Sequence, residues 1–374
     1  MEINTELNPT PHSERNHGIE LLRIFAMLLA AVLHILKKGG VITASEGNLA
    51  AYSTVWLLEA AAYCAVNCYA LISGYVGYSD RPKPLRLARC IELWLQVVFY
   101  SVIITTVYCI AGIGSVGVSD FADAFLPVTS KQYWYFTAYI GMFFFIPLLN
   151  ALVRRLNRRA LVSLCIMLIA VFSLYDTFAS FWKKDPLALV GHSPLWLGVL
   201  YIFGAAVKKL HVPESMSSKK ALLIYASAAV FTALFKITGD RLLRFVPGSL
   251  FVRDTSPTVL LCAAALLVAF ARFKPGRKLT EFAVLFAPAA FGVYLLHVSP
   301  LVFEHVIGNR FAFIGRLPFP LIPFAVLASA GVILAVGLAA DKVRILLFKA
   351  LGVPKMCRKA EKSIRRLWMH VVDA

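Results

Sequence analysis

Arg23 and His34 are the residues whose types and spacing most clearly indicate chemistry. They lie eleven positions apart in the apolar segment 19–36. Eleven helical steps of about 100° return to nearly the same face, so both side chains would share one stripe about 16 Å long. An imidazole is suited to remove a proton from a hydroxyl or an amine, beside a fixed arginine charge. The alternative is an arginine that snorkels to the interface and a purely structural histidine.

The composition predicts that this pair lies inside a membrane. Of the 374 residues, 59% are hydrophobic and 16% are charged, and the mean hydropathy is +0.74. These values are typical of a polytopic membrane protein. Ionisable side chains are costly in a bilayer and usually face a bundle interior, so each is a functional candidate. The net charge of +18 does not indicate nucleic-acid binding, because the basic residues form short clusters between apolar segments.

The elements that must position the pair are transmembrane helices. Ten segments are long and apolar enough to cross a bilayer. We therefore expect an all-α integral membrane protein, a bundle of about ten transmembrane helices. Most of the 38 Lys and Arg fall on one side if the N-terminus is inside, which predicts an N-in/C-in orientation. The expected helix cores are 19–36, 53–77, 90–111, 133–151, 160–175, 194–208, 220–237, 257–271, 283–305 and 319–340.

These segments imply one membrane domain between two tails. We expect residues 1–17 to form a cytoplasmic N-terminal tail without a cleavable signal peptide, and residues 18–341 to form the ten-helix domain. Residues 342–374 are basic and partly amphipathic, so we expect this cytoplasmic C-terminal tail to lie on the anionic leaflet. The seven Cys are scattered without metal-type clustering, and we expect no metal site.

Two arginines follow the second apolar segment. Arg86 and Arg89 are three residues apart, so they would share a helix face at the cytoplasmic surface. Arginine binds phosphate and pyrophosphate through two parallel hydrogen bonds, which predicts a seat for a phosphorylated cofactor. Two alternatives remain open. The positive-inside rule alone would also place arginines here, and Arg89 could simply form an ion pair with Glu92.

Other polar and aromatic side chains in apolar segments are candidate substrate contacts. The alternatives are helix packing and an interfacial aromatic belt. Tyr294 and His297 share one face of the ninth segment. The candidates are Ser73, Tyr75, Trp134, Tyr294 and His297.

Taken together, these motifs resemble the membrane-bound acyltransferase-3 family of bacterial integral-membrane O- and N-acyltransferases. The resemblance rests first on Arg23-x10-His34, the most specific element. The other matching pieces are I-S-G-Y at 72–75 with Arg86-x-x-Arg89, W-Y-F-T-A-Y-I-G-M at 134–142, and F-G-V-Y-L-L-H at 291–297. They follow the family's usual order from about residue 16 to 340. The family's ten-helix bundle agrees with the topology predicted above.

The resemblance implies an acyltransferase that transfers groups other than aminoacyl groups, in the bacterial plasma membrane. The donor would be a cytoplasmic acyl-CoA, above all acetyl-CoA. The acceptor would be a hydroxyl or amine of a cell-envelope glycan or lipid-linked sugar, as in polysaccharide O-acetylation. His34 and Arg23 match the family's catalytic pair, with His34 as general base or acyl relay. Arg86 and Arg89 match its basic motif, which we expect to bind the cofactor.

The chain departs from the family pattern in two respects. Some relatives carry a fused extracytoplasmic esterase-like domain, for which no loop here is long enough. A relay through such a domain would therefore need a separate extracytoplasmic transferase as partner. The ninth segment reads Y-L-L-H-V-S-P at 294–300 rather than the Trp-containing version of other branches, which leaves the acceptor subgroup open.

Two other functional classes are alternatives to an enzyme. A transporter or flippase of a glycan or lipid intermediate would use intramembrane His, Glu and Arg as a proton relay. Against it, the sequence contains few acids and no paired, repeat-related broken helices. The other alternative is a catalytically silent sensor or scaffold of the same fold.

Overall fold

The computed structural model describes residues 15–130, 132–179, 190–242 and 247–372. In this part of the chain all regular structure is helical, which confirms the predicted all-α class. Seven helical segments are long and apolar enough to cross a membrane, and eight if the bent pair α7–α8 counts as one span. Most of the predicted N-terminal tail, residues 1–17, lies outside the described residues.

The spanning segments are partly continuous and partly broken. The helices are α1 (His17–Leu36), α3 (Leu49–Ala62), α4 (Ala65–Gly77), α5 (Leu87–Ala111), α7 (Trp134–Phe143), α8 (Ile146–Arg155), α9 (Arg158–Ile169), α11 (Pro194–Lys209), α13 (Ser218–Arg241), α14 (Pro257–Arg272), α15 (Arg277–Phe286), α16 (Ala290–Val298), α18 (Ile322–Ala350) and α19 (Val353–Val372). Short α-helices connect them, namely α2 (Val41–Ser45), α6 (Val118–Phe125), α10 (Asp176–Ala179), α12 (Val212–Ser215) and α17 (Pro300–Val302).

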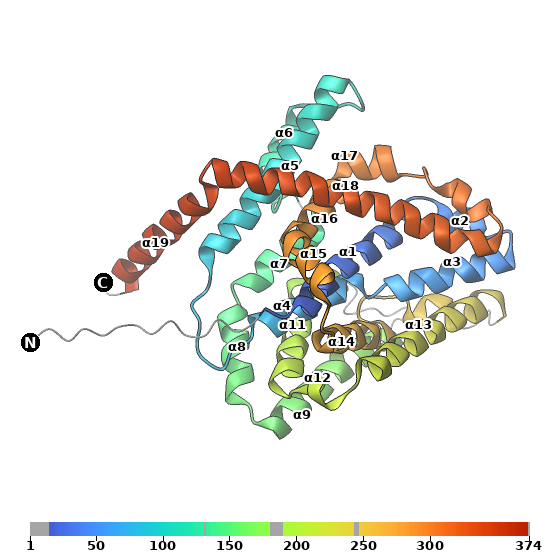
Figure 1. Cartoon of the computed structure of the whole chain (residues 1–374), viewed down its shortest axis with the longest axis horizontal. Coiled ribbons are helices and arrows are strands. Elements are labelled where there is room, and N and C mark those ends of the chain that lie inside the picture. The colour runs from blue at the N-terminus through green and yellow to red at the C-terminus, as the bar shows by residue number, and fades with distance from the viewer. Residues whose placement is uncertain (1–14, 131, 180–189, 243–246, 373–374) are drawn as a thin grey trace, which may run out of the picture.

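α1 lies in the middle of the bundle (Figure 1). It packs against α3, α4, α14, α15, α16 and α18. The side chain of Asn16 caps its first turn by accepting a hydrogen bond from the Ile19 amide at 3.1 Å. Leu22, Ala26, Ala31 and Ile35 are fully buried. The helix that carries Arg23 and His34 is therefore held on all sides.

Two of the ten predicted spans are short. α11 and α14 have 16 residues each, fewer than the roughly 20 that a straight span needs. α11 is nevertheless deeply buried, because Trp196, Leu200 and Tyr201 have no exposed surface. These two helices account for the difference between eight candidate spans and the ten predicted from hydropathy.

The ninth predicted segment is interrupted at both prolines. Pro288 lies in a 3₁₀ turn (η5, Ala287–Ala289) between α15 and α16, as its missing amide hydrogen predicts. Pro300 begins the separate helix α17, so the span ends at Val298 rather than continuing to residue 305.

The predicted boundary between residues 341 and 342 falls inside a helix. α18 continues without a break to Ala350, and Arg344 donates to the buried carboxylate of Asp341 at 2.6 Å. Gln96 and Tyr100 of α5 also donate to that carboxylate. α19 follows and packs against α5, and Arg365 donates to the carbonyl of Leu85, just before α5, at 2.5 Å. Residues 342–350 are therefore part of α18.

Contacts between helix ends define two faces of the bundle. At one face Asn16 donates to the Ala271 carbonyl and Lys208 to the Tyr78 carbonyl. We call this the basic face, because the arginine and lysine clusters predicted to be cytoplasmic lie in its loops. At the opposite face Lys38 pairs with Glu304 and Arg241 donates to the Glu46 carbonyl. α1 runs from the basic face, near Asn16, to the opposite face, near Lys38.

Candidate active site

Two cavities follow α1 from one face toward the other. The first contains Arg23 and Arg89, and we call it the arginine cavity. The second contains His34, and we call it the histidine cavity. Both are lined by Tyr69, Tyr135 and Phe291, so the cavities meet at these three aromatic side chains.

The arginine cavity has a volume of about 290 Å³ and a mixed polar and apolar lining. Arg23 contributes from α1 and Arg89 from the first turn of α5. Tyr69 fixes the wall between α4 and α1, because its hydroxyl donates to the Arg23 carbonyl at 2.7 Å. The lining is Arg23, Tyr69, Ser73, Arg89, Leu93, Tyr135, Phe136, Tyr139, Ala287, Pro288, Ala290 and Phe291.

The charge in this cavity is only partly neutralised. Glu20, which could have neutralised Arg23, instead pairs with His17 at 2.8 Å. Arg23 forms no ion pair with any residue in the described part of the chain. Arg89 forms an ion pair with Glu92 at 3.3 Å, which was one of the two alternatives considered from the sequence. The cavity therefore keeps a net positive charge that suits an anionic ligand.

The histidine cavity is smaller, about 60 Å³, and almost entirely apolar. Its walls come from α1, the start of α4, α7 and α16. Phe303 stands edge-on to the His34 ring, with 5.2 Å between ring centroids. The lining is Met27, Ala30, Leu33, His34, Ala65, Val66, Tyr69, Trp134, Tyr135, Phe291 and Tyr294.

His34 forms a hydrogen bond with a second histidine. Its Nδ1 lies 2.9 Å from Nε2 of His297, and His297 Nδ1 lies 2.6 Å from the Val293 carbonyl. The carbonyl can only accept, so a neutral His297 carries its proton on Nδ1 and accepts at Nε2. His34 must then donate from Nδ1. This assignment leaves His34 Nε2 unprotonated, which is the state that a general base requires.

The structure distributes the predicted substrate residues unevenly. Trp134 and Tyr294 line the histidine cavity, and the buried Tyr294 hydroxyl has no hydrogen-bond partner among the described atoms. Ser73 lines the arginine cavity, although its hydroxyl donates to the Tyr69 carbonyl at 2.9 Å. Tyr75 lines neither cavity, and its ring lies 5.8 Å from the Lys208 ammonium.

The two members of the predicted phosphate seat are separated. Both side chains are exposed, but only Arg89 lines the arginine cavity; Arg86, just before α5, lines neither cavity. The second arginine in this cavity is Arg23, whereas the sequence predicted Arg86. His297, predicted as a substrate contact, instead has both ring nitrogens in hydrogen bonds within the protein.

Three aromatic residues of the site were not singled out from the sequence. Tyr69 precedes Ser73 by one helical turn, so the sequence could have placed Tyr69 on the same helix face as this candidate. Tyr135 was included only in an aromatic run next to Trp134. Phe291 had no distinguishing neighbour in sequence, and only packing between α16 and α7 brings it to the cavity wall.

A polar rim borders the histidine cavity at the opposite face. The ring of His192 stacks edge-on against Trp134, with 4.3 Å between centroids, and its Nε2 lies 3.6 Å from Asp254 Oδ2. Burial raises the pKa of the Asp254 carboxyl to about 7, although the charges of Lys37 and Arg253 lower it. The rim, defined here as Lys37, His192 and Asp254, therefore holds a carboxyl that titrates near neutral pH.

A family model described as an acyltransferase domain matches residues 16–340, which include every residue that lines the two cavities. The chain belongs to the acyltransferase-3 family. It is a membrane acyltransferase by this membership and by its apolar helices. No curated protein and no solved structure shows significant similarity to the chain.

The arrangement suits the chemistry of an acyltransferase. Acyl transfer needs a base that takes a proton from the acceptor and a site that holds the donor away from water. In this acyltransferase the imidazole and the cationic cavity lie on one helix, about 16 Å apart along its axis. The mostly apolar lining of the histidine cavity offers water few hydrogen-bond partners around the base.

Proposed function

We propose that this acyltransferase moves an acetyl group from acetyl-CoA to a hydroxyl or amine of a cell-envelope glycan or lipid-linked sugar. One observation carries the proposal: a cationic cavity and a histidine cavity meet at a shared aromatic wall along α1. The phosphates of coenzyme A match the positive charge of Arg23 and Arg89. The thioester arm then extends between the helices toward His34.

The side of the reaction follows from the proposed topology. Ten spans in an N-in/C-in orientation put the basic face in the cytoplasm of a bacterium, where acyl-CoA is made. The arginine cavity then opens toward the donor, and the rim faces the cell envelope. Two observations support this orientation. The inner loops hold most of the 38 Lys and Arg, and the amphipathic helix α19 lies at the same face.

Labelling of single cysteines tests this orientation. On a Cys-free background, a cysteine at the exposed position Arg158 should be protected from a membrane-impermeant maleimide in intact cells. A cysteine at the exposed position Ser119 should be labelled. Detergent permeabilisation should make both reactive, which controls for local accessibility. The reverse pattern would invert the topology and remove the cytoplasmic donor from the proposal.

The proposed chemical step begins at His34. Its Nε2 takes the proton of the acceptor hydroxyl or amine, whose heteroatom attacks the thioester carbonyl carbon. The new O–C or N–C bond forms as the C–S bond breaks. The coenzyme A thiolate leaves and takes the proton back from His34. His297 keeps His34 in the required tautomer, and the partnerless Tyr294 hydroxyl is placed to donate to the developing oxyanion.

A relay is the second route for the same residues. If donor and acceptor never meet, His34 Nε2 attacks the thioester carbonyl carbon, the C–S bond breaks and the coenzyme A thiolate leaves. The imidazole then carries the acetyl group to the opposite face. A separate extracytoplasmic transferase would then complete the transfer. The rim next to Trp134 is where such a partner or a direct acceptor would reach the histidine cavity.

The donor site predicts a difference between two neighbouring arginines. Arg89→Ala should raise the KM for acetyl-CoA about tenfold, because it removes one charge-assisted contact with phosphate. Arg89→Lys should have a smaller effect, since lysine keeps the charge but not the planar fork. Arg86→Ala should change KM less than Arg89→Ala does, because Arg86 lines neither cavity. In each variant kcat should be nearly kept.

The ion pair between Arg89 and Glu92 provides the control. Glu92→Gln removes the pair but leaves Arg89 in place, so the donor KM should stay at the wild-type value or fall. Steady-state release of coenzyme A measures all four variants. An unchanged KM in Arg89→Ala would remove this residue from the donor site.

A further inference from the structure

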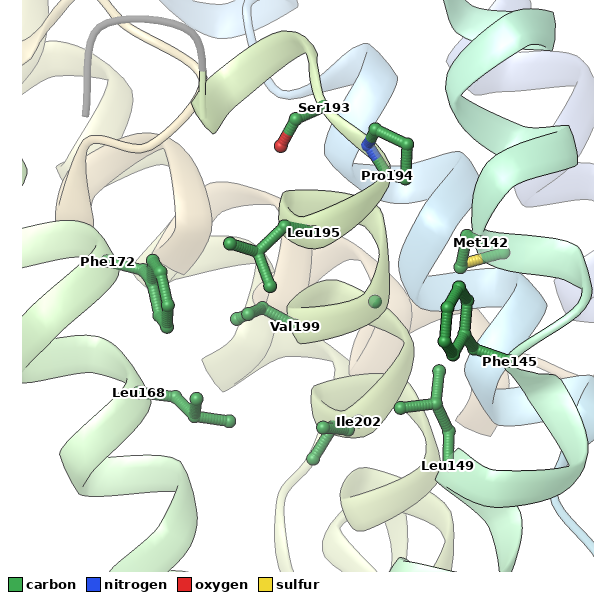
Figure 2. Close-up of a pocket in the computed structure, with 11 residues that line it drawn as sticks. Met142, Phe145, Leu149, Leu168, Phe172, Ser193, Pro194, Leu195, Val199 and Ile202 are labelled. Atoms are coloured by element: carbon green, nitrogen blue, oxygen red, sulfur yellow. The ribbon is translucent and has the colours of Figure 1, made fainter.

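A third cavity lies outside the two that follow α1. It has a volume of about 500 Å³ and an almost wholly apolar lining between α7–α8, α9 and α11 (Figure 2). Figure 2 shows Leu195, Val199 and Ile202 on α11, with side chains of the other helices on either side. We call it the groove. It is lined by Met142, Phe145, Leu149, Leu168, Phe172, Ser193, Pro194, Leu195, Gly198, Val199 and Ile202.

Backbone irregularities open this groove. α7 and α8 are bent by 57° at their junction, and the π-helical segment η1 (Ala170–Tyr175) widens the end of α9. Gly198 on α11 presents no side chain to the space. The nearest atom to a Cβ built there is Leu149 Cδ1 at 3.9 Å. The bend, the π-helical segment and the missing side chain therefore coincide with the space between these helices.

The groove is open to the hydrocarbon of the bilayer. Phe145 and Leu195 in its walls are 58% and 54% exposed. From Pro194 to Ile202 it extends along α11 for about 12 Å, nearly the depth of one leaflet. Its apolar lining offers water almost no hydrogen-bond partners. A hydrocarbon chain is the occupant that fits these walls.

The Ser193 end of the groove lies next to the rim, which contacts the wall of the histidine cavity. Ser193 lines the groove, and the preceding residue is His192 of the rim. His192 stacks on Trp134, whose side chain lines the histidine cavity. A polar head group attached to a chain in the groove would thus lie over the rim, beside the cavity that holds the base.

We infer that the groove binds the hydrocarbon tail of a lipid-linked acceptor and that the rim receives its sugar. This inference rests on the proposed function and selects a lipid-linked saccharide over a lipid-free glycan as acceptor. A bulk phospholipid would need only the groove. Ser193 of the groove directly follows His192 in the chain, His192 contacts Trp134, and Trp134 lines the same cavity as His34, so the tail site lies near the proposed base.

A filling variant tests the tail site. Gly198→Phe should occupy the groove, while the open space around this position allows the protein to fold. Gly331→Phe is the matched control, because Gly331 on α18 also has open space and does not line the groove. The binding probe is a polyprenyl phosphate with a diazirine in its tail, and the cross-linked residues are mapped by mass spectrometry.

The wild type should be cross-linked at Phe145 or Leu195, and unlabelled polyprenyl phosphate should compete whereas phosphatidylglycerol should not. Gly198→Phe should reduce cross-linking about tenfold or more, as expected for overfilled space, and Gly331→Phe should not. Equal competition by phosphatidylglycerol would overturn the inference, because the groove would then be an ordinary lipid site. Cross-linking elsewhere in the wild type would overturn it as well, even if Gly198→Phe failed to fold.

Turnover separates this inference from the proposed function. Acetyl-CoA is supplied with either the organic-solvent extract of bacterial envelopes or the water-soluble glycan fraction. We expect coenzyme A release with the lipid extract, and a raised acceptor KM in Gly198→Phe alone. Release with the soluble glycan only would reject the lipid-linked acceptor and leave the acyltransferase intact. If neither fraction supports release while the polyprenyl probe still binds, the proposed function fails.

Discussion

Replacing His34 with alanine is expected to lower acyl transfer by about 10²–10⁴-fold, the usual contribution of a general base. The imidazole lies in an apolar cavity, and its Nδ1 is engaged by His297 at 2.9 Å. Its Nε2 is therefore the nitrogen available to the acceptor. No other described residue that lines the histidine cavity carries an imidazole, an amine or a carboxylate that could take the proton. The substitution should leave no replacement for the lost base.

The measurement is the rate of acceptor-dependent coenzyme A release, with thermal unfolding as the check on folding. His211→Asn is the control, since His211 is exposed, pairs with Glu214 and lines neither cavity. It should keep wild-type activity. If His34→Ala retained a tenth or more of the rate, His34 could not be the base. Loss of folded protein would support a structural role.

The second large effect is expected at His297, which acts through His34 rather than on substrate. His297→Leu removes the acceptor for His34 Nδ1–H, so the proton is free to move to Nε2 and block the base. We expect kcat to fall by about 10–100-fold, as for other residues that orient a functional histidine. The KM for acetyl-CoA should not change, because His297 is remote from the arginine cavity.

His297→Gln separates this positioning role from packing. Glutamine offers a carbonyl oxygen in place of Nε2, so it should restore part of the rate that His297→Leu loses. Both variants also remove the hydrogen bond that His297 Nδ1 donates to the Val293 carbonyl. Equal losses in Leu and Gln would indicate that His297 serves packing alone, and no loss in either would remove it from the mechanism.

The sequence predicted the features that depend on local periodicity and hydropathy. The shared stripe of Arg23 and His34 follows from the helical repeat, and both side chains line cavities along α1. The membrane class follows from composition. The arginine and histidine ends of the site could therefore be predicted from the sequence alone. Segment hydropathy also placed every helix that lines the site.

Features that depend on packing between distant helices could not be predicted from the sequence. His297 is 263 residues from His34 in the chain, and only the packing of α16 against α1 brings the rings together. Arg86 and Arg89 are equivalent by spacing and both are exposed, yet only Arg89 lines the cavity that contains Arg23. The groove depends on a bend and a π-helical segment that carry no clear sequence signature.

The transporter alternative receives no support from the family or from the arrangement of the site. The family match is to an acyltransferase domain. Several intramembrane polar groups that a proton relay would need are engaged in local pairs, such as Asp341 with Arg344 and Arg89 with Glu92. An enzyme that uses His34 accounts for both cavities.

The most direct test of acyl transfer uses purified wild-type protein, radiolabelled acetyl-CoA and an envelope extract. The account predicts that coenzyme A is released only when the extract is present and that the label appears in an extract component in equal amount. His34→Ala should show neither. Release of coenzyme A without an acceptor product, or an extract component labelled equally by His34→Ala, would contradict the account.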